Sequence, residues 1–380
     1  MTNHFTILTN NQSDKAGLIN TLIKSKKPKE FSALNGKEFK LFSKNTLKKL
    51  IDEEEVHDRK IITKESLQSL KSMSSGEQKQ LLLHHLLQQK PEFLLLDNPF
   101  DNLDADFQEK LKSILIEVSK QTTLILIISR IEDVLPIASK CYALEKDNLI
   151  TVDSLSKYVQ SKNKTSKTHS IPLNKNFGNY KETELIRFTN VSVSFDGKCV
   201  LDTINWTINK GDFWQLIGKN GSGKTTLLSM LIGENSKGYG QELYLFGKKK
   251  GSGESIWDIK KKIGYFTPTM NHNFSGNHSI ENMVLSGLND SIGLYVKPTE
   301  IQLRTAKQWL VIAELDNIKK KRFCDATIGQ QRLAMLVRAM VKQPLLLILD
   351  EPTNDLDIMT LNILEDFLLD FPGSVIIVSH

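Results

Sequence analysis

Cysteine is scarce in this chain of 380 residues, and the three present, Cys141, Cys199 and Cys324, show no C-x-x-C spacing. An odd, widely spaced set argues against a disulfide framework and predicts free thiols in a reducing compartment. The sequence also lacks an apolar run of about 20 residues, which a membrane-spanning helix needs. Its first fifteen residues lack the charged segment and apolar core of a secretory signal. We therefore expect a cytoplasmic protein, at most peripheral on the cytoplasmic face of the inner membrane.

Neither sign of charge dominates the composition. The net charge is +6, and 39% of the residues are hydrophobic, which is typical of a globular protein long enough for two domains. Basic runs occur at 248–250, 260–262 and 319–322. They are predicted to be solvated faces, and contact with nucleic acid is a weakly supported alternative.

A phosphate-binding loop is the strongest motif in the sequence. Residues 218–225 read GKNGSGKT and match G-x-x-x-x-G-K-[ST]. Such a loop turns backbone N–H groups toward phosphate, while Lys224 reaches the terminal phosphates and the Thr225 hydroxyl can bind Mg²⁺. A strand-like run at 214–217 precedes the loop and a helical pattern follows, so phosphate would lie at a helix N-terminus. The residues expected to bind the nucleotide here are Gly218, Asn220, Gly221, Ser222, Gly223, Lys224, Thr225 and Thr226.

One pattern occurs twice along the chain. An apolar strand ends at Asp97 in one copy and at Asp350 in the other, and a second Asp follows each by seven residues. A motif containing Gly76 or Gly329 precedes that first Asp by 21 residues in both copies. A helical segment and a later apolar strand complete each copy. Agreement at all these offsets predicts two copies of one structural unit.

The boundary between the copies is predicted from composition. Residues 151–183 are rich in lysine, serine and asparagine and are expected to form an exposed linker. The first domain would then span 1–150, with few residues before its first strand, and the second would span 184–380.

Alternating strands and helices around a phosphate loop predict an α/β fold with a mainly parallel sheet flanked by helices. Strand-like runs at 185–188 and 191–195 are followed by the turn signal Asp196-Gly197. These features add an antiparallel hairpin at the start of the second domain.

The combined motifs resemble an ATP-binding cassette (ABC) ATPase, once in each half of the chain. The phosphate loop is followed by a short signature, a strand ending in Asp350-Glu351, a Leu-Asp pair and Ser379-His380. The segment 243–260 resembles the tandem-cassette subfamily of molybdate-transport operons, the ModF or photorepair (PhrA) proteins. The resemblance implies two P-loop nucleotide-binding domains with a helical insert, ATP with Mg²⁺, and hydrolysis to ADP and phosphate. It also leads us to expect that the second cassette is truncated after His380.

The resemblance assigns catalytic and binding roles to single residues. Glu351 would orient and polarise the attacking water, His380 would contact the γ-phosphate, and Lys224 would neutralise developing charge. Phe195 would lie against the adenine. Phosphoryl transfer depends mainly on such positioning and charge stabilisation.

The resemblance also assigns the metal ligands. Thr225 would bind Mg²⁺ directly, and Asp350 would bind it through water. One departure from the family pattern is Pro268, which stands where most such cassettes carry glutamine. The contact of that loop with Mg²⁺, or with a transport partner, is therefore left open.

The first copy has lost the residues that this chemistry needs. Its counterpart of the phosphate loop, residues 9–16, keeps Lys15 but contains no glycine. Asp14 adds a negative charge where phosphate would lie, and the alanine after Lys15 cannot bind Mg²⁺. Asn98 and Arg130 replace the glutamate and the histidine of the second copy. The sequence predicts that this copy has no active site of its own.

The signature of the first copy, Ser74-Ser75-Gly76, is nevertheless intact. In cassettes of the kind resembled, two domains face head to tail, and each ATP lies between one phosphate loop and the opposite signature. Ser74 and Gly76 are therefore expected to complete the site at Lys224. The opposite pairing joins the broken loop to the signature at 326–329, and both halves of it are poor. We expect one competent composite site.

Two uses of such a site stay open. ATP turnover would energise a separate membrane permease, or it would serve a non-transport task such as DNA repair or regulation. An ATP-dependent binding switch with little turnover is the alternative class of function, and Pro268 and the eroded first copy favour it.

Overall fold

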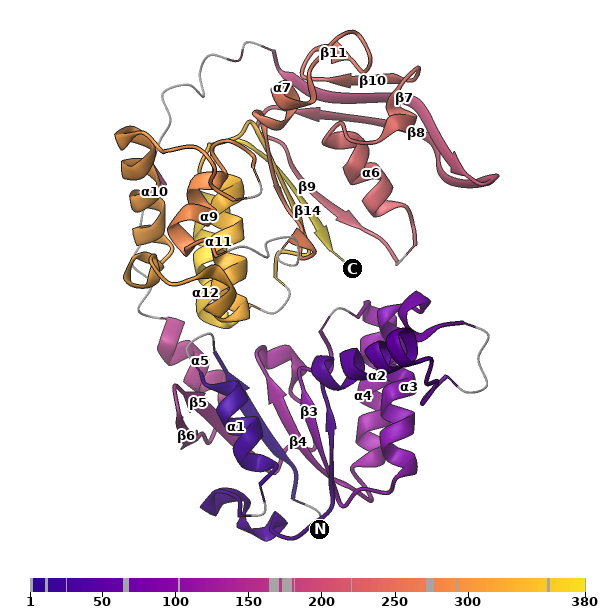
Figure 1. The fold of residues 1–380 in the computed structure, drawn as a ribbon, viewed down its shortest axis with the longest axis vertical. Helices are drawn as coiled ribbons and strands as arrows, with labels where there is room; N and C mark the ends of the chain where they lie inside the picture. Colours follow the sequence, from indigo (N-terminus) through magenta and orange to yellow (C-terminus); the bar gives the residue numbers. More distant parts are fainter. Residues whose placement is uncertain are drawn as a thin grey trace. The chain divides into compact units, whose positions relative to one another are not determined.

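The fold, taken from a computed structural model, is described for residues 3–10, 13–24, 26–63, 68–101, 103–163, 171–172, 180, 182–219, 221–270, 277–291, 293–353 and 356–379. The chain divides into two compact units (Figure 1). The first comprises Met1–Ser166 and the short segment Asn354–Leu361. The second comprises Lys167–Thr353 and Asn362–His380.

The first unit is built on a six-stranded sheet in the order β2-β3-β4-β1-β5-β6. Strands β1 to β5 all run parallel to their neighbours, and β6 pairs with β5 in the antiparallel direction. All five residues of β1 are buried, as a central strand covered on both faces requires. The strands are β1 (Phe5–Thr9), β2 (Phe39–Phe42), β3 (Phe93–Asp97), β4 (Thr123–Ile128), β5 (Lys140–Glu145) and β6 (Asn148–Thr151).

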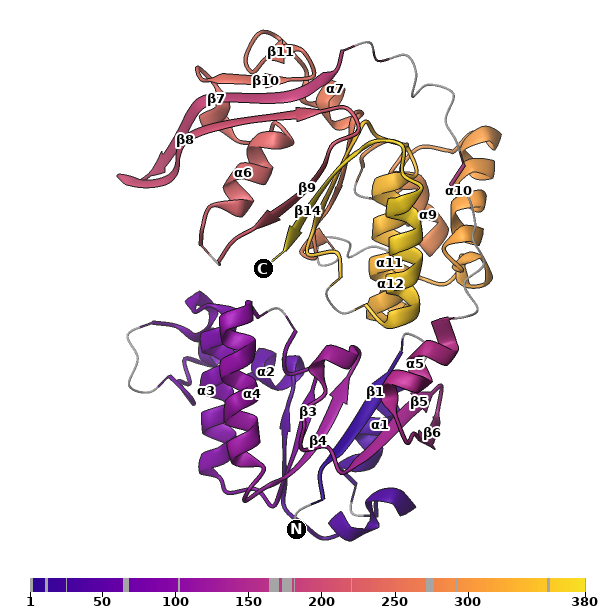
Figure 2. The ribbon, with the colours of Figure 1, turned by 180° about the vertical axis from the view of Figure 1, so that it is seen from behind.

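Helices cover both faces of this sheet. Apolar side chains of α3, α4 and α5 form one core, and those of α1 form the other. Seen from behind, α3 and α4 lie side by side (Figure 2). The helices are α1 (Lys15–Leu22), α2 (Lys44–His57), α3 (Ser75–Gln88), α4 (Ala105–Val118) and α5 (Leu155–Asn163).

Helix α5 corrects one expectation. Its residues belong to the predicted exposed linker, yet Leu155 and Val159 are 6% and 8% exposed and pack in the first core. Apolar residues four apart share one helix face, so this pair anchors a segment whose lysine-rich composition suggested solvent. The prediction of an exposed linker was wrong for 155–159, and most of the remaining linker residues lie outside the described part of the chain.

The second unit contains two four-stranded sheets. An antiparallel sheet has the order β11-β10-β7-β8, and a parallel sheet has the order β12-β13-β14-β9. The expected hairpin is confirmed: Asp196 and Gly197, both at positive φ, join β7 to β8 in a two-residue turn. The strands are β7 (Glu184–Phe195), β8 (Lys198–Asn209), β9 (Phe213–Ile217), β10 (Glu242–Leu245), β11 (Lys248–Lys249), β12 (Ile263–Phe266), β13 (Leu346–Asp350) and β14 (Ser374–Ser379).

The core of the second unit lies where α6 meets strands of both sheets. Two helices, α9 and α10, form the helical insert expected before the signature. The α/β fold class, with its antiparallel addition, is thereby confirmed. The helices are α6 (Lys224–Leu231), α7 (Ile256–Lys260), α9 (Ile280–Ser286), α10 (Glu300–Ile312), α11 (Ile328–Met340) and α12 (Ile358–Leu369). Within the described residues, no helix is both long and apolar enough to cross a membrane.

The two units repeat local backbone geometry as well as element order. Asn98 and Glu351, which directly follow β3 and β13, have φ of 42° and 46°. Their N–H groups donate to the carbonyls of Ile127 and Val378, each at 2.9 Å. A positive φ is unusual for a residue other than glycine, and its occurrence at both positions agrees with the predicted internal repeat.

Candidate functional site

The phosphate loop joins β9 to α6, as the sequence predicts. Gly221 and Gly223 have φ of 78° and 92°, a region that glycine enters without strain. Gly223 is also the N-cap of α6, and a β-carbon there would lie 2.9 Å from the Val200 carbonyl oxygen. The loop therefore requires glycine at this position for two independent reasons.

A cavity of about 250 Å³ opens at this loop and gathers most of the predicted catalytic and metal-binding residues. Lys224 folds back over the loop, and its ammonium donates to the carbonyls of Gly218 and Lys219, the latter at 3.1 Å. Asp350 and Glu351 reach the cavity from the end of β13. The lining comprises Val200, Lys219, Gly221, Gly223, Lys224, Thr225, Thr226, Asp350 and Glu351.

The donor set of this cavity suits magnesium. The Thr225 hydroxyl and the Asp350 carboxylate line the same space, and hard oxygen donors are what Mg²⁺ prefers. Among the described residues, no cluster of three or more His, Cys, Asp or Glu side chains could hold a metal by itself. The residues therefore fit an ion that takes further ligands from water and phosphate, as Mg²⁺ usually does.

Thr267 is a residue of this site that the motif analysis missed. Its hydroxyl donates a 3.1 Å hydrogen bond to Asp350 Oδ2, from the residue just before Pro268. Strand β12 pairs with β13 in register, Phe266 opposite Leu349, so the two strand ends meet at one edge. Burial, together with the Asp350 charge, raises the pKa of Tyr265 to about 12, so this neighbouring phenol stays neutral. Only the register, which no motif records, reveals Thr267.

Other predicted residues lie apart or are not described. Phe195 ends β7 with 43% of its surface exposed, and Lys237 Nζ lies 5.8 Å from its ring centre. It does not line the cavity, so its contact with adenine stays a prediction. Ser222 closes the loop through its N–H, which donates to the Lys219 carbonyl at 3.2 Å. Asn220 and His380 lie outside the described residues.

The corresponding region of the first unit holds carboxylates of its own. Asp14 is the N-cap of α1 and accepts a 2.8 Å bond from the Gly17 N–H. Lys15 Nζ lies 2.8 Å from the Asp97 carboxylate. The helix N-terminus and the lysine that would bind phosphate thus both have an internal anionic partner.

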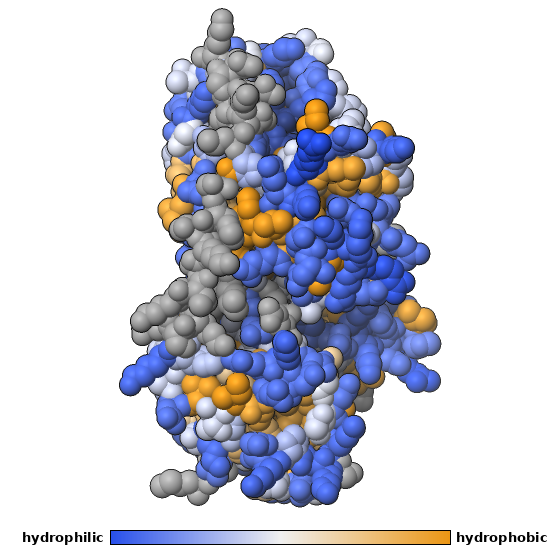
Figure 3. All heavy atoms as spheres, turned by 90° about the vertical axis from the view of Figure 1, so that its left-hand side faces the viewer, coloured by the Kyte–Doolittle hydropathy of each residue, from blue (hydrophilic) through white to orange (hydrophobic). Residues whose placement is uncertain are grey.

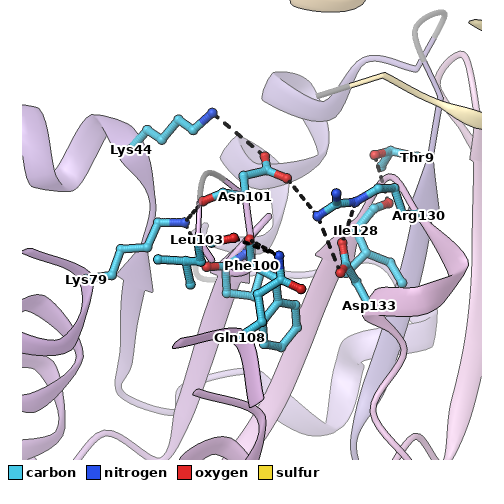
Figure 4. A network of polar contacts seen from close by, with 11 residues as sticks. Thr9, Lys44, Lys79, Phe100, Asp101, Leu103, Gln108, Ile128, Arg130 and Asp133 are labelled. Atoms are coloured by element: carbon cyan, nitrogen blue, oxygen red, sulfur yellow. Dashed lines mark hydrogen bonds and ion pairs between the residues drawn. The ribbon is translucent and has the colours of Figure 1, made fainter. Parts of the chain in front are cut away.

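Arg130, at the position of the second copy's terminal histidine, is also engaged internally (Figure 4). Its Nε donates to Asp133 at 3.1 Å, and its Nη2 lies 3.6 Å from Asp101. Arg130 has 17% of its side chain exposed, and that of Asp101 only 1%. These contacts agree with the prediction that the first copy has no working site.

Both signatures form the N-terminus of a helix. Ser74 caps α3 in a capping box with Glu77, and Thr327 caps α11 in a capping box with Gln330. The Glu77 carboxylate accepts from the Ser74 N–H and hydroxyl at 2.8 and 2.7 Å, and these bonds lower its pKa. In the first copy the cap therefore carries a negative charge, whereas in the second it is neutral.

Gly76 is packed closely within its own unit. A β-carbon at this position would lie 2.8 Å from the Phe107 ring of α4. The absence of a side chain at Gly76 is therefore required by helix packing, whatever ligand its N–H meets.

The basic runs are largely neutralised by neighbouring acids. Lys250 is only 5% exposed, so the run 248–250 is not a continuous solvated face. Ion pairs join Lys249 to Glu242, Lys260 to Glu234, Lys319 to Asp316, Lys320 to Glu281, and Arg322 to Asp325. This pairing weakens the case for a nucleic-acid footprint.

Comparison with known proteins relates the chain to one family. A family model described as ABC transporter matches residues 201–354. The ABC transporter ATP-binding protein ModF of Escherichia coli (strain K12) is 34% identical over 323 residues, covering 78% of this chain and 64% of that protein. An uncharacterised ABC transporter ATP-binding protein of Schizosaccharomyces pombe is 32% identical, covering 82% of this chain and 66% of that protein. The chain thus spans about two thirds of the length of these relatives.

Among solved structures, cbiO1 from Clostridium perfringens, described as part of the ABC transporter complex cbiONQ, is similar to this chain. The TM-score is 0.45 at 23% identity, covering 52% of this chain and 79% of that one.

Proposed function

The chain belongs to the ABC ATPase family, and on that premise we propose that its second unit binds ATP with Mg²⁺ and hydrolyses it to ADP and phosphate. The observation that carries this proposal is the cavity at the phosphate loop. It brings Lys224 and Thr225 together with Asp350 and Glu351, from two segments that lie far apart in the sequence.

Each of these residues has a distinct part in the proposed reaction. Lys224 and the N–H groups of the loop neutralise phosphate charge at the N-terminus of α6. Thr225 and Asp350 would hold Mg²⁺, which when bound supplies positive charge next to the phosphates. Glu351 has the carboxylate that orients the attacking water and accepts its proton. Little covalent chemistry is asked of the protein itself.

Replacement of Glu351 by glutamine tests the proposal. We expect Glu351→Gln to keep ATP affinity and to lower steady-state hydrolysis about 100-fold or more, the usual scale for loss of a general base. Phosphate release and binding of a fluorescent ATP analogue measure the two quantities. Lys224→Ala is the matched control, because it should lose binding itself.

The same comparison decides the alternative function. An ATP-dependent binding switch, with Pro268 replacing the usual glutamine, predicts that wild type and Glu351→Gln have equally negligible turnover. Equal rates with intact binding would contradict hydrolysis and favour the switch.

We further propose that this site is composite. The second unit's phosphate loop would be completed by Ser74 and Gly76 of the first unit. Support comes from the sequence and from each unit by itself: the second has an intact loop, and the first has an intact signature at the start of α3. The counterpart loop in the first unit has its lysine and helix N-terminus engaged by Asp97 and Asp14.

We propose that ATP turnover drives a separate membrane permease. The helical insert exposes apolar side chains, with Tyr295 at 77%, Val296 at 66% and Ile301 at 78%. Figure 3, which views the side bearing α10, shows apolar patches on a mainly hydrophilic surface. An open groove of about 910 Å³ also runs along α10, and such surfaces commonly contact partner proteins. Co-purification with a permease would support a role in transport. Salt-sensitive DNA binding would support a role in repair or regulation.

A further inference from the structure

A network of charged side chains, most of them buried, joins α3 to three other segments of the first unit (Figure 4). Lys79, on α3, is 7% exposed, and its ammonium donates to the carbonyls of Pro99, at 2.8 Å, and Asp101. The Asp101 carboxylate lies 3.8 Å from Lys44 at the start of α2 and 3.6 Å from Arg130 after β4. Arg130 also forms an ion pair with Asp133. The turn after β3 is therefore held by three cations: Lys79 from α3, Lys44 from α2 and Arg130 from the end of β4.

From this arrangement we infer that Lys79, Asp101 and Arg130 are positioning residues that fix the N-terminus of α3 on the first unit's sheet without a nucleotide in that unit. Lys79 lies one helical turn beyond the signature, so anchoring its side chain fixes the turn that carries Ser74 and Gly76. The inference rests on the proposed function in one respect, namely that this turn serves the ATP held by the second unit.

The chemistry of the network supports this assignment. Lysine is almost never buried unless it is paired, and here it is held by main-chain oxygens of the turn that carries Asp101. The second unit also buries a cation at the corresponding position, Arg332, which is 5% exposed. Arg130 replaces the residue that would contact γ-phosphate, and it takes its anionic partners from within the protein. Removing one member leaves other buried charges or carbonyls without their partner, so the effect should concentrate at this junction.

Hydrogen exchange on the whole 380-residue chain, followed by mass spectrometry, tests the inference. We expect Lys79→Met and Asp101→Asn each to raise exchange about tenfold in peptides covering α3 and the turn at 99–101. Peptides covering β1 and β4 should be unchanged. Lys79→Arg should preserve wild-type exchange, because arginine serves at the corresponding place in the second unit.

Lys110→Met is the matched control. Lys110 also contacts α3, through a 3.2 Å bond to Gln80, but it is exposed and outside the network. It should leave exchange in α3 within twofold of wild type. Unchanged exchange in both network variants would overturn the inference, and so would a uniform rise that includes β1 and β4.

ATP turnover separates this inference from the proposed composite site. If the network and the composite site are both correct, Asp101→Asn should lower kcat and keep ATP affinity. If exchange rises in α3 while kcat is unchanged, the positioning role stands and the composite site is wrong. If exchange is unchanged, the positioning role falls whatever the turnover.

Discussion

Thr267 contributes a single hydroxyl to the proposed metal site. It is the residue before Pro268, and its bond to Asp350 comes from a strand end where the family pattern places a different side chain one position later. A hydrogen bond to a carboxylate fixes its orientation. We therefore expect Thr267 to orient the Asp350 carboxylate toward the proposed Mg²⁺ ion.

Thr267→Val removes this hydroxyl and keeps the side-chain shape. We expect the Mg²⁺ concentration for half-maximal ATP-analogue binding to rise about three- to tenfold, since such a bond contributes on the order of 1 kcal/mol. Binding measured in the presence of EDTA should not change. Thr267→Ser should restore the wild-type Mg²⁺ dependence, and an unaltered dependence in the valine variant would refute the role.

At the scale of elements, the first turn of α3 must satisfy two requirements, the proposed phosphate binding and helix packing. Its N-terminus is proposed to meet ATP phosphate, yet Gly76 is already pressed against Phe107 of α4. Loss of function after a change at Gly76 would therefore be ambiguous, because overpacking alone costs about 1–3 kcal/mol.

A second substitution resolves that ambiguity. Gly76→Ala should lower ATP turnover at least tenfold, and it should also lower the melting temperature because the new methyl group meets the Phe107 ring. Adding Phe107→Ala removes the ring and should recover the stability lost by overpacking, leaving turnover low. Phe107→Ala alone provides the baseline. Recovery of turnover in the double variant would mean that Gly76 serves packing only.

The type and order of the helices and strands could be predicted from short sequence patterns, whereas the burial of each element could not. The loop at 218–225, the apolar strands and the Asp196-Gly197 turn are each specified by a few adjacent residues. Helix α5 was missed because its anchors, Leu155 and Val159, are isolated in a lysine-rich segment. Likewise β1 and β9 have matching roles, yet β1 is buried while Phe213 and Ile217 of β9 are 60% and 63% exposed. Strand order, which decides this difference, is a property of the sheet.

The residues of the candidate site also fall into those that the sequence predicts and those that only the structure reveals. Lys224, Thr225, Asp350 and Glu351 were predicted because each belongs to a contiguous motif. Thr267 and the partners of Asp101 come from segments distant in sequence, and their roles depend on register and packing. The first copy illustrates the difference well. Its loss of glycine was visible in the sequence, but the engagement of Lys15 by Asp97 was not.

At the scale of the whole molecule, the two units differ in what neutralises their phosphate-binding groups. In the first unit Asp14 caps α1, Asp97 pairs with Lys15, and Arg130 is held by Asp133. A nucleotide would have to displace these internal anions while bringing three or four negative charges of its own. In the second unit Gly223 caps α6 without a side-chain hydrogen bond. Binding is therefore expected at one loop per chain.

The stoichiometry of ATP bound to Glu351→Gln, which is expected to trap the nucleotide, tests this asymmetry directly. Equilibrium binding of radiolabelled ATP in Mg²⁺ should saturate at about one nucleotide per chain. Adding Lys224→Ala should reduce it to near zero, because that lysine belongs to the only competent loop proposed here. Lys15→Ala serves as the matched change in the first unit and should leave the value near one. Two nucleotides per chain, or one that survives Lys224→Ala, would show that the first unit binds ATP despite its internal carboxylates.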